Sequence, residues 1–579
     1  MPSDNSCNMW VFRDGRSRVA GRSVLQGLAS ALRGLGISPG RDALTNALLR
    51  AGELECALAD AASPQAARLA GLTDQVAAAL LDGELSHPVS PAGETRVGHP
   101  SGAAQEWARA LEEIEVPDWL DLPTSEGFAY YALHPLDFAE LSQQAPLAGA
   151  QAAVVGIRSI GATLSAVVTA ALARRGLRAR RITARPTGHP FDRRCEFNSE
   201  QLSWIDRQRA HNADFLVVDE GPGISGSSFL SVGDALLRAG VERRRITFLC
   251  SRHADPDLLV AREAGVRWRA FRCLYSGPTA YVPPEAKIYV GGGAWRRYFY
   301  GAEAQWPASW VQMERLKFLS ADGARLYKFE GLGRFGVETA ERARRLAGGG
   351  FGPRLEQLAC GFAEYPVLRG RPMSEADVSP AVLERLADYC VFRAAEFAAP
   401  AAPGPELEQM LRFNVGEEFG VQPDAGTSAL AVARPIVADG RMLPQEWLAT
   451  AEGVLKSDGV SHGDDHFFPG VTDIAWDLAG AMVEWEMTRD AGQYFLERYG
   501  RRSGDDPRPR LPAYLLAYST FRMAYCAMAA FAVRGSEEEP RLRRAWRRYR
   551  AHVEAMIGPA KLAGGQRPVA SGREELAAD

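Results

Sequence analysis

The chain has 579 residues, more than one domain normally holds, and its apolar content of 46% is ordinary for a globular protein. The net charge of −4 argues against a broad nucleic-acid surface, and we find no uncharged apolar run approaching ~18 residues, so we expect no membrane span. The eight cysteines are scattered without the close spacing of zinc or redox pairs. We therefore expect a multi-domain protein of the reducing cytoplasm.

Four regions follow one another along the chain. Residues 1–125 have apolar residues at helical spacing and a linker over 86–104, and residues 126–300 alternate short apolar strands with helices. That alternation is typical of an α/β fold with a doubly wound, mainly parallel sheet. Residues 301–561 predict an α+β region, and residues 562–579 a disordered tail. We expect helices over 23–35, 42–62, 163–175, 228–239 and 256–264, and middle-region strands over 152–156, 179–184, 214–219, 246–251 and 268–274.

Two adjacent acids, Asp219 and Glu220, follow an apolar strand and precede a Gly/Ser-rich loop and a helix. Ligands of open α/β sheets bind at the carboxyl ends of the strands. Loop N–H groups and a helix N-terminus suit a phosphate, and paired acids suit vicinal sugar hydroxyls. The expected phosphate-binding positions are Gly223, Ser225, Gly226, Ser227 and Ser228.

This stretch resembles the phosphoribosyl-pyrophosphate signature of type I phosphoribosyltransferases, although its spacing and Gly221-Pro-Gly223 depart from the pattern. The resemblance implies that Asp219 and Glu220 are catalytic, holding the ribose and stabilising an oxocarbenium-like transition state. It also implies Mg²⁺ on the diphosphate and an unidentified base or acceptor. The alternative is an ordinary turn between strand and helix with a serine cap.

Two further loops suit a diphosphate. In 152–165, Arg158, Ser159 and Gly161 lie in a strand–loop–helix segment that resembles the pyrophosphate loop of the same family. Over 185–194, Arg185, His189 and Arg193 lie where the family carries a mobile loop over the active site. A solvated basic loop is the alternative for 185–194.

Lysine is rare in this chain, which has 62 arginines but only five lysines. A lysine here is therefore a candidate for a role that needs a compact ammonium, and Lys328 and Lys456 draw attention. Lys328 lies on an expected strand and Glu341 on the helix that follows. A strand lysine paired with a helix glutamate is how protein-kinase-like folds place a cation on nucleotide phosphates.

The C-terminal region resembles the aminoglycoside phosphotransferase and choline kinase group. Trp476-Asp477-Leu478-Ala479 matches the Asp-Leu-Ala helix start of that group, and residues 439–448 overlay its catalytic loop. The resemblance implies Mg²⁺ and ATP, with Asp458, Glu446 and Asp473 as candidate metal ligands. Arg441 stands at the position of the catalytic aspartate and cannot act as a base, so Asp439 is the candidate replacement.

A second alignment places catalysis in His462-Gly463-Asp464-Asp465-His466, with Asp464 as the base and Asp473 or Asp477 as the metal ligand. The carboxylates of 458–477 are also compatible with a metal-dependent hydrolase, or with a polar loop whose acids cap a helix.

Three functions are compatible with the sequence, and one of them is the metal-dependent hydrolase centred on residues 458–477. The first is a phosphoribosyltransferase fused to a kinase-like phosphotransferase, acting in nucleotide-like small-molecule metabolism. The second is a regulatory protein that binds a phosphoribosyl ligand without turnover and has an inactive kinase-like region. The apolar segment 511–531 is expected to be a core helix, and a homo-oligomer is one option for the assembly.

Overall fold

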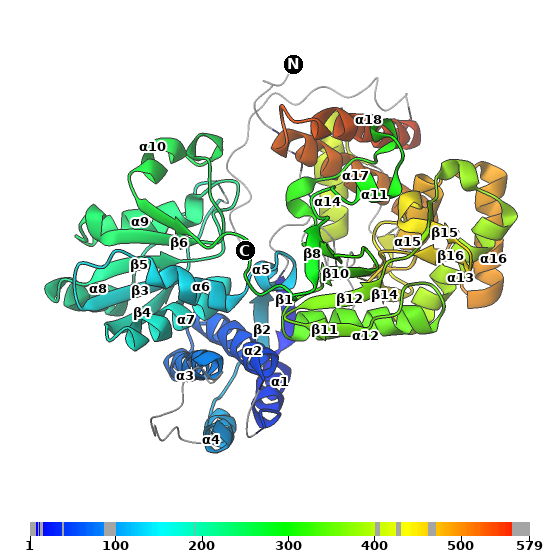
Figure 1. Cartoon of the computed structure of the whole chain (residues 1–579). Helices are drawn as coiled ribbons and strands as arrows, with labels where there is room; N and C mark the ends of the chain where they lie inside the picture. The colour runs from blue at the N-terminus through cyan, green and yellow to red at the C-terminus, as the bar shows by residue number, and fades with distance from the viewer. Residues whose placement is uncertain are drawn as a thin grey trace.

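The computed structural model describes residues 7, 9, 11, 16–36, 40–85, 100–189, 191–399, 406–423, 430–460 and 470–558. Most of the predicted linker (86–99), the stretch 461–469 with Asp464, and the predicted tail lie outside these residues. Figure 1 shows two large lobes beside each other, with the N-terminal helices below and between them.

One lobe is built on a five-stranded, wholly parallel sheet with the strand order β4-β3-β5-β6-β7. The central strands β5 and β6 are buried along their whole length, as expected for a parallel sheet covered on both faces. The predicted α/β fold with a mainly parallel sheet is therefore confirmed. The strands are β3 (Gln151–Ile157), β4 (Arg178–Ala184), β5 (Asp214–Val218), β6 (Ile246–Cys250) and β7 (Arg272–Tyr275).

The helices of this lobe agree less well with the predictions. The expected helix over 256–264 is wrong, because a 3-10 turn (Pro256–Leu258) stands there and α10 (Ala264–Arg269) follows it. The helix α8 (Ser199–Ala210) was not predicted, because Ile205 is its one buried residue and no apolar periodicity marks it. The other helices are α5 (Glu126–Ala129), α6 (Pro135–Gln143), α7 (Ile160–Arg174) and α9 (Ser227–Arg238).

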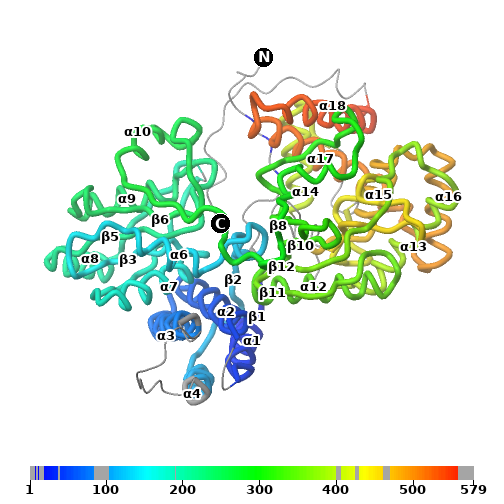
Figure 2. Tube along the Cα trace, in the orientation of Figure 1, coloured from blue at the N-terminus to red at the C-terminus, as the bar shows by residue number. Residues whose placement is uncertain are grey.

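The N-terminal helices form one core with the parallel-sheet lobe. Leu48 and Leu54 of α2 belong to the same buried cluster as Ala166 and Val167 of α7. The elements are β1 (Arg16–Ala20), α1 (Gly21–Arg33), α2 (Arg41–Asp60), α3 (Ala66–Leu85), α4 (Pro100–Glu112) and β2 (Trp119–Pro123), with β1 antiparallel to β2. In Figure 2 the trace of α2 runs from beneath the parallel-sheet lobe toward β11 of the other lobe. Across that junction Arg334 contacts Glu53 at 3.1 Å.

The second lobe opens with an antiparallel sheet in the order β11-β12-β10-β9-β8. Its helix α12 (Arg334–Gly348) connects β10 to β11. Strand β8 lies within 126–300 yet pairs with β9, so this sheet includes a strand from the predicted middle region. The strands are β8 (Ala286–Tyr289), β9 (Lys317–Ser320), β10 (Arg325–Phe329), β11 (Gln357–Ala359) and β12 (Phe362–Pro366), and the short α11 (Arg296–Phe299) lies between β8 and β9.

The rest of the second lobe is mainly helical. Among the described residues, α17 alone is long and apolar enough to cross a membrane, and 72% of its apolar window is buried inside the protein, as in a core helix. The helices are α13 (Pro380–Glu396), α14 (Glu406–Phe419), α15 (Ala475–Glu484), α16 (Arg489–Ser503), α17 (Leu511–Ala532) and α18 (Glu538–Ile557). Short strands pair as β13 (Gly370–Pro372) with β15 (Trp447–Thr450), β15 with β16 (Gly453–Lys456), and β14 (Pro435–Val437) with β17 (Val471–Asp473).

Candidate functional site

The loops after β3, β4 and β5 meet at one edge of the parallel sheet. Because β3 lies between β4 and β5, the strand order reverses at β3, and open α/β sheets bind ligands at the carboxyl ends of the strands beside such a reversal. Arg158 follows β3, Arg185 follows β4, and Asp219 and Glu220 follow β5. The structure therefore brings the predicted sugar-phosphate residues of three separate loops to the same edge.

The acid pair at this edge is half-buried and only partly neutralised. The Oε2 atom of Glu220 accepts a hydrogen bond of 2.9 Å from the backbone N–H of Gly127 in α5. Burial raises the pKa of Asp219 to about 7, although Arg185 and Arg193 oppose the shift. Burial and the nearby Glu126 raise the pKa of Glu220 to about 8. Both carboxyls therefore change protonation near neutral pH.

The two arginines predicted to bind the diphosphate already have an internal partner. Asp60, at the end of α2, contacts Nη1 of Arg158 at 2.9 Å and Nε of Arg185 at 3.0 Å. Arg185 also donates to the carbonyl of Arg158 at 2.7 Å. Burial raises the pKa of Asp60, but the two guanidinium groups outweigh it and the net shift is downward. The sequence analysis missed Asp60, because it lies almost a hundred residues from Arg158 and in a different predicted region.

In the predicted phosphate loop, residues 223–228, some polar groups contact each other and others face solvent. The Oγ atoms of Ser225 and Ser227 lie 2.9 Å apart, and Gly226 has a φ of +68° at the start of α9. Gly223 is exposed, with open space where a side chain would stand. Ser228 is half-buried. Gly223 thus presents its backbone outward, while the hydroxyls of Ser225 and Ser227 contact each other.

The remaining predicted residues of this edge differ in accessibility. Gly161 is buried, and an added Cβ would lie 2.6 Å from the carbonyl oxygen of Val218, so this glycine allows α7 to pack closely on β5. Ser159 has a φ of +123°, which is strained for a residue with a side chain. His189 is exposed, and its Nδ1 accepts a hydrogen bond from the N–H of Phe191.

A second site is a cavity of about 270 Å³ between the antiparallel sheet and the helical part of the second lobe. The ammonium of Lys328, on β10, lies 2.7 Å from Oδ1 of Asp458 and 3.1 Å from Glu330. Burial lowers the pKa of Lys328, but Asp458 and Glu330 outweigh it, so the lysine keeps its charge. Apolar walls are supplied by Trp295, Phe299, Leu326, Tyr365 and Leu448.

The predicted pairing of Lys328 with Glu341 is replaced by these contacts. Glu341 is 53% exposed, contacts Arg345 at 3.2 Å, and does not line the cavity. Glu330, by contrast, lies two residues after Lys328, where an extended chain directs both side chains to one side. This spacing is a signal that the sequence analysis did not use.

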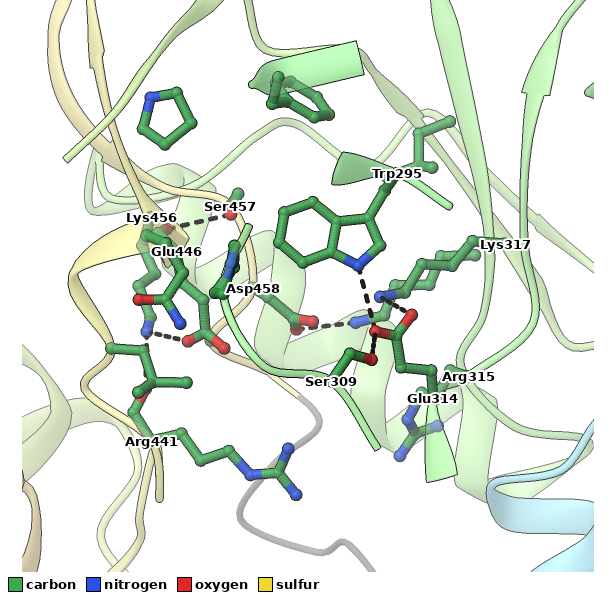
Figure 3. A pocket seen from close by; sticks show the side chains of 18 of the residues that line it. Trp295, Ser309, Glu314, Arg315, Lys317, Arg441, Glu446, Lys456, Ser457 and Asp458 are labelled. Atoms are coloured by element: carbon green, nitrogen blue, oxygen red, sulfur yellow. Dashed lines mark hydrogen bonds and ion pairs between the residues drawn. The ribbon is translucent and has the colours of Figure 1, made fainter. Parts of the chain in front are cut away.

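On the other side of the cavity, Lys456 is fully buried and faces carboxylates (Figure 3). Its ammonium lies 2.7 Å from Oε2 of Glu446, 3.4 Å from Oδ1 of Asp439 and 3.1 Å from the carbonyl of Arg441. Burial lowers the pKa of Lys456, but Asp439 and Glu446 outweigh it. Trp295 points toward Glu314 on the opposite wall and donates to it at 3.1 Å.

Of the two carboxylates in loop 439–446, Glu446 lines the cavity, where it contacts Lys456 at 2.7 Å, and Asp439 does not. Arg441 lines the cavity with its guanidinium 4.9 Å from the ring of Tyr525. Asp439, the candidate replacement base, is fully buried, accepts a hydrogen bond from the hydroxyl of Tyr389, and does not line the cavity. Asp477 fixes the loop by accepting from the N–H groups of Asp439 and Gly440 at 2.8 and 3.0 Å.

The three predicted metal ligands do not share one site, because Glu446 and Asp458 line the cavity and Asp473 does not. Asp473 is fully buried and accepts from backbone N–H groups and from Nε of Arg510 at 2.8 Å, while Glu446 and Asp458 each face a lysine. Among the described residues no group of three His, Cys, Asp or Glu side chains has the arrangement of a metal site. The candidate base Asp464 lies outside the described residues.

The chain matches no protein-family model and no curated protein sequence. Its structural neighbours include small-molecule kinases. A choline/ethanolamine kinase family protein from Mesorhizobium loti is 17% identical with a TM-score of 0.31, over 44% of this chain and 89% of that one. The choline kinase LicA from Streptococcus pneumoniae is 13% identical with a TM-score of 0.29, over 41% and 90%. The macrolide 2'-phosphotransferase MphH from Brachybacterium faecium is 14% identical with a TM-score of 0.27, over 42% and 89%. These neighbours give no support to a phosphoribosyltransferase in the middle region.

Proposed function

We propose that the second lobe binds a nucleotide such as ATP in the 270 Å³ cavity. The observation that supports this most is the buried Lys328–Asp458 pair of 2.7 Å, which places an ammonium and a carboxylate inside a cavity with aromatic walls. Aromatic walls suit a base, and an ammonium suits phosphate oxygens. An antiparallel sheet that carries this lysine and is followed by a helix is the arrangement expected of a kinase-like lobe.

Phosphoryl transfer needs a group that accepts the proton of the attacking hydroxyl, and the carboxylate of loop 439–446 that lines the cavity, Glu446, is paired with the ammonium of Lys456. Arg441 stays protonated, and Asp439 is buried in its own hydrogen bonds. We therefore propose nucleotide binding as the function of this lobe. The sequence-based alternatives of a kinase with Asp464 as base and of an inactive kinase-like region differ only in turnover.

Calorimetric titration with a non-hydrolysable ATP analogue tests this proposal. We expect saturable binding to the wild type and a loss of about tenfold or more in Lys328→Met, which removes the ammonium, whereas Asp458→Asn leaves that ammonium to the phosphates and should bind at least as tightly as the wild type. Lys287→Met, at an exposed position on β8, is the matched control and keeps wild-type affinity. Absent binding, or equal affinity in all four proteins, contradicts the proposal.

A second candidate function is sugar-phosphate binding at the edge of the parallel sheet, up to phosphoribosyl transfer from phosphoribosyl pyrophosphate. It is favoured by the adjacent half-buried acids Asp219 and Glu220 at the carboxyl end of β5, beside the point where the strand order reverses. Titration with phosphoribosyl pyrophosphate and Mg²⁺ should give binding that the double variant Asp219→Asn/Glu220→Gln weakens about tenfold. Unchanged affinity in the double variant removes the proposed ribose contact.

A further inference from the structure

Two carboxylates line the proposed nucleotide cavity, and each is paired with a lysine of the chain. A kinase-like site would hold Mg²⁺ with the carboxylates of Glu446 and Asp458. Each of these carboxylates lies 2.7 Å from a lysine ammonium, Glu446 from Lys456 and Asp458 from Lys328. The residues present therefore do not fit a magnesium site of this kind.

Lys456 has the surroundings of a bound cation. Its ammonium is fully buried and lies within 3.4 Å of oxygens from the side chains of Glu446 and Asp439 and from the backbone of Arg441, with the ring of Trp447 at 5.5 Å. Hard cations in proteins are held by the same set of carboxylate and carbonyl oxygens. One ammonium thus pairs with two carboxylates, of which Glu446 lines the cavity and Asp439 is buried behind it.

The choice of lysine is informative in a chain with 62 arginines and five lysines. Three of the five, Lys317, Lys328 and Lys456, line this cavity. An ammonium is a compact point charge, whereas a guanidinium is a wide planar fork, so a lysine suits a position where three oxygens surround a single nitrogen.

The cavity has further positive side chains that can balance the negative charge of a nucleotide without Mg²⁺. Arg315 and Arg441 line the cavity together with the lysines. A nucleotide without Mg²⁺ carries more negative charge than its complex, and these side chains provide positive charge close to it.

Resting on the proposed nucleotide binding, we infer that the Lys456 ammonium takes the place of a divalent cation, so that this cavity binds nucleotide phosphates without Mg²⁺.

Titration of the full chain with the non-hydrolysable ATP analogue, in EDTA and in excess Mg²⁺, tests this inference. We expect the two dissociation constants to agree within about threefold. Binding that is tenfold or more tighter in Mg²⁺ overturns the inference and leaves the proposed function intact. Absent binding in both conditions overturns the proposed function, and the inference with it.

A variant makes the test specific to the lysine. Lys456→Met leaves the carboxylate of Glu446, which lines the cavity, without its ammonium partner, so we expect at least about tenfold weaker binding in EDTA, with partial rescue by Mg²⁺. Lys456→Met/Glu446→Gln keeps the net charge and is expected to lose the magnesium rescue. Circular dichroism checks that both variants fold, and Lys287→Met is the control. A folded Lys456→Met that binds as the wild type does in EDTA contradicts the assignment; if neither variant folds, the wild-type comparison decides.

Discussion

The carboxylates at the two candidate sites differ in what surrounds them: those at the sheet edge have raised pKa values, and those in the cavity are paired with lysines. At the parallel-sheet edge, burial raises the pKa of Asp219 to about 7 and of Glu220 to about 8, while the nearby Arg158 and Arg185 are bonded to Asp60 instead. In the cavity of the second lobe, Asp458 and Glu446 each contact a lysine at 2.7 Å. The comparison shows that the charge state of an acid depends on the cation that packs against it and not on its position in a loop.

The two regions are joined by the short helix α5. The N–H of its Gly127 donates to Glu220 at the sheet edge. On the other side, Phe128 accepts from the N–H of Leu332, and Ala129 accepts from Arg315, which lines the cavity. The comparison therefore concerns two sites that share one structural support.

The largest expected effect concerns the paired charges of the second lobe. Arg393 is 1% exposed, lies 3.4 Å from Asp477, and donates to the carbonyl of Gly459 at 2.7 Å. Arg393→Met leaves Asp477 as a buried uncompensated charge, so we expect the free energy of unfolding to fall by about 3–5 kcal/mol. Urea denaturation measures the free energy of unfolding. The control is Arg371→Met, whose arginine is in an exposed pair with Asp377, and it should lower the free energy of unfolding by less than ~1 kcal/mol. Equal costs would mean that burial does not set the strength of these pairs.

The next effect removes the internal partner at the sheet edge. Asp60→Asn releases the guanidinium groups of Arg158 and Arg185, so inorganic pyrophosphate should bind about tenfold more tightly than to the wild type. Calorimetry measures the affinity. Asp74→Asn, which affects the Arg181 pair elsewhere, is the control and should leave it unchanged. Weaker pyrophosphate binding in Asp60→Asn would show that Asp60 positions the arginines for the anion rather than competing with it.

A smaller effect concerns pH. The folded-state pKa of Asp219, about 7, lies above its ordinary value of 3.8, so the folded protein holds a proton that the unfolded chain releases. Stability from this group is complete below about pH 4 and is lost as the pH rises toward 7. In Asp219→Asn the decline in unfolding free energy between pH 5 and pH 7 should be shallower than in the wild type by about 2 kcal/mol. Urea denaturation at pH 5 and at pH 7 measures the unfolding free energy of both proteins. An equal decline in the wild type and in Asp219→Asn would mean that Asp219 is solvated in the folded protein.

The smallest effect distinguishes the observed lysine partners from the predicted one. Glu341 is exposed and contacts Arg345 on its own helix. We expect Glu341→Gln to change unfolding free energy by less than ~0.5 kcal/mol and to leave nucleotide affinity within about twofold of wild type. A larger loss of affinity would restore Glu341 as a partner of Lys328.

The sequence predicts the parallel sheet well because its strands are short apolar runs separated by helices. It fails at α8, whose side chains are almost all solvated and carry no apolar period. It also fails at 256–264, where Asp255 caps a 3-10 turn at Pro256 in place of the expected helix start.

At the sites, the sequence identifies residues that bear charge but not which of them meet. Lys328, Asp458, Lys456 and Glu446 were all singled out, and the structure places them around one cavity. The partners Asp60 and Tyr389 lie 98 residues from Arg158 and 50 from Asp439, and no local spacing connects such positions. Long-range contacts of this kind depend on how α2 and α13 pack, which periodicity alone does not fix.

The most direct test of nucleotide binding is a crystal structure of the full chain with the non-hydrolysable ATP analogue. We predict that the phosphates lie in the cavity within ~3 Å of the Lys328 ammonium, with the base against the aromatic wall that includes Trp295 and Tyr365. An empty cavity at saturating analogue, or an analogue bound solely at the Asp219–Glu220 edge, would contradict the account.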